Sequence, residues 1–99
     1  MINEETLFKV LPHGSGIDCD WRFERTKQSI RAYNSFHCMD EIGYYDGYQN
    51  FVVIFPNSDP HNFRLQFTGN RRGERKYHLR EYLEDTIYWA LKEIPETIA

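Results

Sequence analysis

The sequence contains only two cysteines, and no hydrophobic run approaches the roughly 20 residues needed to cross a bilayer. Its opening, MINEETLFKVLPHG, begins with acidic residues and holds too short an apolar stretch for a signal peptide. We therefore expect a cytoplasmic protein with no membrane partner. In that compartment Cys19 and Cys38 are expected to be reduced thiols, whether or not they face each other across a hairpin.

Motifs that indicate catalysis or cofactor binding are also absent: the sequence has no G-x-S-x-G, P-loop, H-E-x-x-H or Rossmann glycine pattern. It has no cysteine pair at the spacing of zinc sites, and its four histidines are scattered. Asp18 and Asp20 would share a strand face, but with Arg22 and Arg25 nearby they are more typical of a solvated surface. We therefore predict no enzyme activity, no metal site and no cofactor.

Aromatic residues, by contrast, are plentiful. Seven Tyr, seven Phe and two Trp make up 16% of the chain, and aromatic side chains favour strands. The apolar share of 40% is ordinary for a globular protein. A chain of 99 residues supports one core, so we predict a single domain over residues 1–99.

Alternation of apolar and polar residues predicts four strands, at about 19–25, 30–39, 48–55 and 63–68. The third is apolar on both faces from Phe51 onward, which is typical of a central strand or one covered on both sides. Polar turns at 26–29 and 56–60, and the turn signal Asp46-Gly47, separate the strands. Because sequential strands are usually neighbours, we predict an antiparallel meander in the order 1-2-3-4.

A long amphipathic helix is predicted over about residues 74–94, and Tyr82, Thr86 and Trp89 flank its apolar stripe. Residues 2–11 show a weaker helical pattern. The predicted fold class is therefore α+β: a four-stranded antiparallel β-meander with a long C-terminal helix packed on one face and a short N-terminal helix. The predicted core comprises Trp21, Phe23, Phe36, Val52, Ile54, Phe63, Leu65, Phe67, Leu79, Leu83, Ile87 and Leu91.

The placement of charge is the most unusual feature of the sequence, whose formal net charge is −3. Residues 64–80 hold six cationic residues against one acid, a net charge of +5, whereas residues 81–99 hold five acids against one lysine, a net charge of −4. This order opposes the macrodipole of the predicted helix, where a favourable terminal charge stabilises by about 0.3–1 kcal/mol. A local rule broken without evident gain indicates a functional surface.

Two segments are candidates for partner binding. The start of the long helix combines cationic side chains with glycines that would let an anion approach free main-chain N–H groups. The loop IGYYDGY offers amphipathic rings of the kind enriched at recognition surfaces. The alternative is that the arginines neutralise acids of the protein itself or are simply solvated, and that half of the tyrosine rings cap the edge of the core. The predicted partner-binding residues are Tyr44, Tyr45, Arg71, Arg72, Arg75 and Lys76.

The expected order of helix, strands and helix, with a basic cluster opening the last helix, is similar to that of double-stranded-RNA-binding domains. That resemblance implies phosphate contact at the start of the helix, but this chain has four strand signals where that family has three. In length and lack of motifs the chain also looks like the small accessory proteins of phages and mobile elements.

Together these features favour a small, non-enzymatic interaction module that engages a protein partner through the Tyr-rich loop and the basic helix start. The first alternative is a nucleic-acid (RNA or DNA) backbone binder that uses residues 64–80. Because the net charge is negative, such binding is expected to be no tighter than about 10⁻⁴–10⁻⁶ M at physiological salt. The second alternative is a small metal-dependent enzyme.

Overall fold

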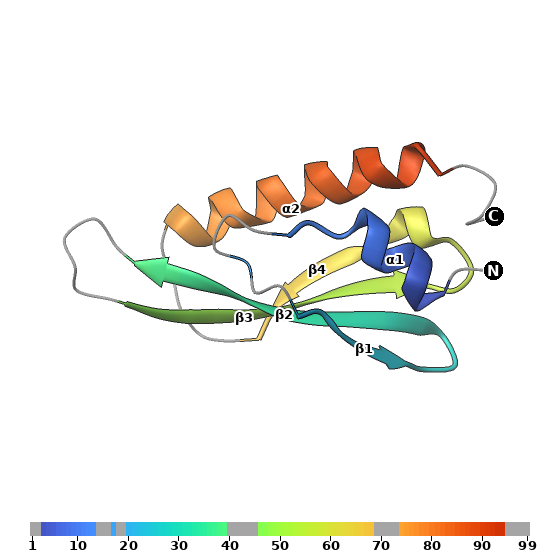
Figure 1. The fold of residues 1–99 in the computed structure, drawn as a ribbon, viewed down its shortest axis with the longest axis horizontal. Coiled ribbons are helices and arrows are strands. Elements are labelled where there is room, and N and C mark those ends of the chain that lie inside the picture. Colours follow the sequence, from blue (N-terminus) through green and yellow to red (C-terminus); the bar gives the residue numbers. More distant parts are fainter. Residues whose placement is uncertain (1–2, 14–16, 18–19, 40–45, 69–73, 95–99) are drawn as a thin grey trace.

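The computed structural model describes residues 3–13, 17, 20–39, 46–68 and 74–94. Their order is α1 (Glu4–Val10), β1 (Arg22–Arg25), β2 (Ser29–Met39), β3 (Asp46–Pro56), the short 3-10 helix η1 (Pro60–Asn62), β4 (Arg64–Phe67) and α2 (Glu74–Lys92). Figure 1 shows α2 lying lengthwise over the sheet. The predicted α+β fold, with a four-stranded antiparallel sheet, a long C-terminal helix and a short N-terminal helix, is confirmed.

The strands form one antiparallel sheet in the predicted order β1-β2-β3-β4. β2 and β3 pair along their whole length, from Ser29 opposite Pro56 to Met39 opposite Asp46. The edge strands β1 and β4 have four residues each, and short edges limit strand-to-strand association with other chains. The predicted turn at Asp46-Gly47 is wrong, because both residues pair with β2 and belong to β3. A two-residue turn signal is weaker than the continuous pairing of a long hairpin.

Local polar contacts fix the ends of the first elements. The side chain of Asn3 caps α1 by accepting a 2.8 Å hydrogen bond from the amide of Thr6. In the β1–β2 turn, the hydroxyl of Thr26 accepts hydrogen bonds from the amides of Gln28 and Ser29 at 3.2 and 3.0 Å. The predicted turn at 26–29 is thus confirmed, with Ser29 already the first residue of β2.

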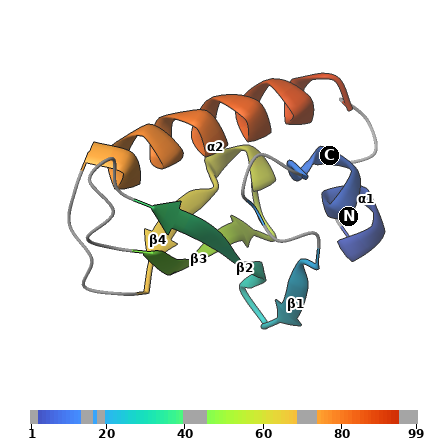
Figure 2. The same cartoon turned by 60° about the vertical axis from the view of Figure 1, so that its left-hand side comes forward.

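Both helices lie on the same side of the sheet (Figures 1 and 2). α1 also contacts α2, so the two helices and the sheet enclose a single layer of apolar side chains. No described helix or strand covers the other side of the sheet, which we call the uncovered face.

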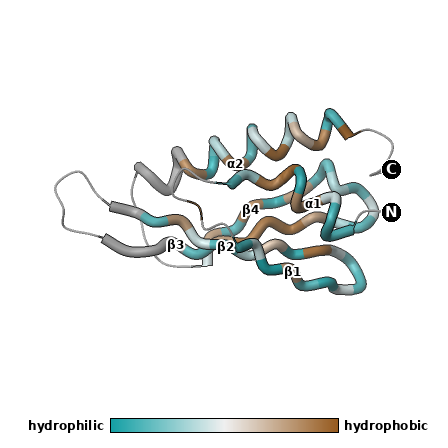
Figure 3. Tube along the Cα trace, in the orientation of Figure 1, coloured by the Kyte–Doolittle hydropathy of each residue, from teal (hydrophilic) through white to brown (hydrophobic). Residues whose placement is uncertain are grey.

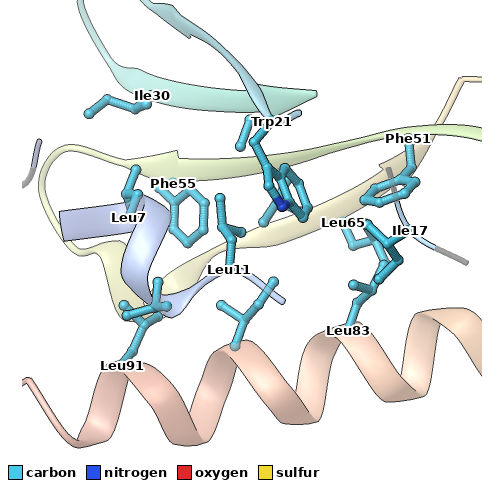
Figure 4. Close-up of a cluster of buried hydrophobic side chains, with 14 of the residues drawn as sticks. Leu7, Leu11, Ile17, Trp21, Ile30, Phe51, Phe55, Leu65, Leu83 and Leu91 are labelled. Carbon is cyan, nitrogen blue, oxygen red and sulfur yellow. The ribbon is translucent and has the colours of Figure 1, made fainter. Parts of the chain in front are cut away.

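The core lies between the sheet and α2. Figure 3 shows the hydrophobic stretch in the middle of β3, and Figure 4 shows Leu83 and Leu91 pointing from α2 toward the sheet. Leu79, Leu83, Ile87 and Leu91 recur every four residues along α2 and are all buried, as the helical pattern predicts. Truncation of any one of these side chains to alanine should lower the free energy of unfolding by about 2–5 kcal/mol.

The N-terminal segment contributes more to the core than the sequence predicts. Leu7, Val10, Leu11 and Ile17 are buried, and Figure 4 shows Leu7, Leu11 and Ile17 between the sheet and α2. The indole N–H of Trp21 donates a 3.0 Å hydrogen bond to the carbonyl of Pro12, which holds this segment over the sheet. The N-terminal segment is therefore part of the core despite its weak helical pattern, because it fills space between the sheet and α2.

The alternation along β3 corrects the predicted core. Val52 and Ile54 are buried as predicted, but they do not belong to the cluster beneath α2. That cluster takes Phe51, Val53 and Phe55 instead, so Val52 and Ile54 point to the uncovered face. The sequence could not decide between the two sets because five consecutive residues of β3 are apolar.

Candidate functional site

Most of the residues predicted to bind a partner lie outside the described part of the chain. Four are outside it entirely: Tyr44, Tyr45, Arg71 and Arg72. The other two, Arg75 and Lys76, belong to the first turn of α2, but their side chains are outside the described part as well. Their role in partner binding therefore stays a prediction.

Arg80, the last cation of the basic segment 64–80, is occupied by contacts within the protein. Its Nη1 donates a 2.8 Å hydrogen bond to the carbonyl of Leu65 on the edge strand β4. The guanidinium carbon lies 5.1 Å from the centre of the Phe67 ring, and Nη1 lies 3.6 Å from a carboxylate oxygen of Glu84, one helical turn later. Arg80 therefore has a structural role, because its contacts connect α2 to β4.

Among its described side chains, α2 exposes three aromatic rings to solvent: Tyr82, Tyr88 and Trp89, which we call the α2 aromatic cluster. Trp89 is 65% exposed, and the two tyrosines are 42% and 41% exposed. The rings of Tyr88 and Trp89 meet edge to face, with centroids 5.2 Å apart. Tyr82 lies two helical turns before Trp89, so these two rings follow one line along the helix. Three large rings are thus displayed on the outer side of a rigid element.

Acidic side chains border this cluster. Asp85 is three residues after Tyr82 and four before Trp89, which makes it a neighbour of both on the helix surface, and it is exposed. Glu93 lies one turn beyond Trp89 and is exposed too. The ammonium of Lys92 is placed 5.0 Å from the centre of the Tyr88 ring. Aromatic faces beside carboxylates attract cationic groups, because ring and carboxylate both carry negative potential.

The sequence pattern places Tyr82 and Trp89 beside the apolar stripe without indicating that they are exposed. The sequence signal that could have identified them is their spacing of seven residues, which puts both on one line of the helix with an acid between them. That line does not include Leu79, Leu83 and Leu91. Only the packing of that leucine line against the sheet shows that Tyr82 and Trp89 are exposed.

The residues considered for metal binding or catalysis do not converge in the described part of the chain. No group of three or more His, Cys, Asp or Glu side chains there could hold a metal ion. His13 lies beside Phe8 after α1, whereas His37 is on β2 and His61 is on η1. Asp20 precedes β1 rather than belonging to a strand, and Asp18 and Cys19 lie outside the described residues.

Comparisons with known proteins give no match: no family model, curated protein or solved structure is similar to this chain. The resemblance to double-stranded-RNA-binding domains is accordingly limited to the order of the elements. The structure contains the fourth strand that the sequence predicts. Within the described residues, no helix is long and apolar enough to span a membrane.

Proposed function

We propose that this protein is a non-enzymatic interaction module that engages a protein partner, with the α2 aromatic cluster at the centre of the interface. The observation that carries the proposal is the 65% exposure of Trp89 beside two further exposed rings on the same helix. Trp and Tyr are enriched among the residues that dominate binding energies, whereas single exposed apolar residues are common on any surface.

The magnitude supports an anchor at Trp89. An aromatic side chain offers about 150–250 Å² for burial, so covering the exposed part of Trp89 removes roughly 150 Å² from water. At about 25 cal/mol per Å² this gives nearly 4 kcal/mol before the costs of association. The three rings together supply well under the roughly 800 Å² that a stable interface buries on each partner. Neighbouring surface must therefore contribute, and Tyr44, Tyr45 and the basic helix start remain our proposed contributors.

The shape of the site indicates how the partner binds. The α2 aromatic cluster projects from a helix, so the partner supplies the groove, as when an amphipathic helix lies in a hydrophobic groove. Asp85 and Glu93 border the rings, so cationic residues in the partner would match the charge of the rim. These properties favour a protein surface over a small molecule, which binds in a concave pocket.

The test is affinity capture from an extract of the source organism, with the wild type, Trp89→Ala and Phe8→Ala. Phe8 is the matched control because it is an aromatic residue, 44% exposed, on the other helix. We expect a protein that the wild type and Phe8→Ala retain and that Trp89→Ala loses. With that protein purified, Trp89→Ala should weaken the dissociation constant by roughly 30-fold, the effect of losing about 2 kcal/mol.

An Arg71/Arg72/Arg75→Ala variant tests the second half of the proposed interface in the same experiment. Loss of the same partner would support a role for the basic helix start. If the wild type, the Trp89 variant and the triple variant recover identical proteins, the proposed interface is wrong.

A nucleic-acid backbone binder that uses residues 64–80 is the alternative function, and one observation bears on it. Arg80 is held by Leu65, Phe67 and Glu84, which leaves five of the six cations of that segment for phosphates. Five phosphate contacts on duplex DNA would give a log–log salt slope of roughly −4.5. A slope close to zero, or no binding at low salt, would exclude this function.

A cytoplasmic location and an origin as a phage or mobile-element accessory protein are also part of the proposal. Both rest on the sequence, that is, on the absence of a long apolar run and on the length and lack of motifs. Fractionation of cells that express a tagged chain tests the location: enrichment in the membrane fraction would contradict it.

A further inference from the structure

The uncovered face of the sheet carries two rows of side chains that cross all four strands. One row, read from the cross-strand register, is Arg22, Tyr33, Val52 and Gln66. The other is Glu24, Arg31, Ile54 and Arg64. Because side chains alternate along a strand, all eight point away from the cluster beneath α2.

The central strand β3 contributes two buried apolar side chains to this face. Val52 and Ile54 are only 3% and 6% exposed, although no described helix or strand lies over them. Their direct neighbours on this face are long side chains: Arg31 and Arg64 lie across from Ile54, and Tyr33 and Gln66 lie across from Val52. Arginine side chains beside apolar neighbours cover them with their stems and keep the charged group toward water.

The two rows together carry a net charge of +2, from three arginines against Glu24, which lies directly across from Arg31. Arg22, Arg31 and Arg64 form no ion pair in the described part of the chain, and Glu24 is the only acid among the described side chains of this face. The Nε atom of Arg31 is buried and has no hydrogen-bond partner. A buried donor without an acceptor is unfavourable, so a side-chain movement that turns this N–H toward an incoming anion would be favoured.

The spacing lets Arg31 act together with each of the other two arginines. Strands lie about 4.8 Å apart, so Arg31 and Arg64, with β3 between them, start from positions about 10 Å apart. Arg22 and Arg31 are diagonal neighbours at about 7–8 Å. Arg31 therefore lies within or close to the Debye length of about 8–10 Å from each of the other two arginines, whereas Arg22 and Arg64, three strands apart, are farther from each other. Tyr33, half-buried, lies directly opposite Arg22.

We propose that the uncovered face binds single-stranded nucleic acid, with Arg22, Arg31 and Arg64 on phosphates and Tyr33 stacked on a base. A positively charged surface with an aromatic ring is the arrangement that single strands use. A duplex fits less well, because a flat sheet face offers nothing to enter a groove and the acids of α2 repel a backbone that wraps around the molecule. This site is distinct from the α2 aromatic cluster, because α2 lies on the other side of the sheet from the uncovered face (Figure 2).

The test is fluorescence anisotropy with labelled single-stranded RNA and DNA of about ten nucleotides, a length within the usual site size. The comparison probes are a duplex of the same length and an oligoglutamate peptide of the same charge. Three phosphate contacts on a single strand predict a log–log salt slope of about −2, which is about −0.7 for each contact. We expect dissociation constants in the micromolar range at low salt, for single strands and not for oligoglutamate.

Variants then locate the site. Arg31→Gln and Arg64→Gln should each reduce the slope by about 0.7. Tyr33→Leu should weaken binding at least about five-fold without changing the slope, because stacking carries no charge. Arg25→Gln is the matched control, since Arg25 lies on the same strand as Arg22 but on its other face, paired with Glu4 at 3.4 Å. Circular dichroism confirms that each variant is folded.

Three results would overturn the proposal: oligoglutamate binding as tight as that of the oligonucleotide, an Arg25→Gln effect equal to that of Arg31→Gln, or loss of binding only in Arg71/Arg72/Arg75→Ala. Trp89→Ala should leave nucleic-acid binding unchanged. Failure of this inference is therefore separable from failure of the proposed protein interface.

Discussion

Val52 and Val53 are adjacent residues of the same type on β3, and they test directly which face of the sheet is the core. Val53 is fully buried in the cluster beneath α2, with Ala32 and Leu65 directly across from it on the neighbouring strands. Val52 is on the uncovered face, with Tyr33 and Gln66 across from it. Threonine keeps the branched shape and the preference for strands while replacing a methyl group by a hydroxyl.

The two substitutions should differ in cost. At position 53 the new hydroxyl enters apolar surroundings, which costs about 1–3 kcal/mol. At position 52 the polar side chain of Gln66 lies directly across and can bond to the new hydroxyl, so the cost should stay below about 1 kcal/mol. An unfolding entropy near 2.1 cal/mol/K per residue gives roughly 0.2 kcal/mol/K for 99 residues. Each 1 kcal/mol therefore lowers Tm by about 5 °C.

Urea unfolding followed by circular dichroism and tryptophan fluorescence measures both variants against the wild type. The slope m should be unchanged, so that the shift in midpoint reports stability alone. If Val52→Thr costs as much as Val53→Thr or more, the uncovered face is a second core. The assignment of faces and the nucleic-acid proposal would then both fail.

Three further predictions concern the rest of the chain. Leu83→Ala should lower the free energy of unfolding in urea by about 2–5 kcal/mol, because Leu83 is buried. Tyr82→Ala, one residue earlier and exposed, should change it by no more than about 0.5 kcal/mol. Equal costs would contradict the packing of α2 on the sheet. The pKa of Glu4 is lowered by a hydrogen bond from its own backbone and by Arg25. The contribution of ionised Glu4 to folding stability is therefore present above the ordinary glutamate pKa of about 4.3 and is lost as the pH falls below that value. The stability difference between wild type and Glu4→Gln, less than about 1 kcal/mol near pH 6, should therefore shrink toward pH 3, and a difference that grows would refute this. Iodide should quench the fluorescence of the wild type strongly and that of Trp89→Phe weakly, because Trp21 is buried and Trp89 is not; strong quenching in both would show that Trp21 is accessible.

Much of the fold follows from the sequence by itself, because local periodicity is set by backbone geometry. Strict alternation at Arg64–Phe67 and recurrence every four residues from Leu79 to Leu91 could arise only from a half-buried strand and a half-buried helix. Neighbouring strands joined by short turns then pair in chain order. The α+β class and the strand order were determined at this level.

The tertiary structure decided what local patterns leave open. The residues from Phe51 to Phe55 are apolar on both faces of the strand, so the sequence does not show which face is the core. Phe51, Val53 and Phe55 belong to the core because α2 packs on their side of the sheet. The weak helix at Glu4–Val10 gained its role from the space between sheet and α2. The exposure of Trp89 and the unpaired Nε atom of Arg31 are likewise properties of packing, since a side chain is buried or exposed only relative to elements distant in sequence. Both candidate surfaces therefore depend on the assembled fold.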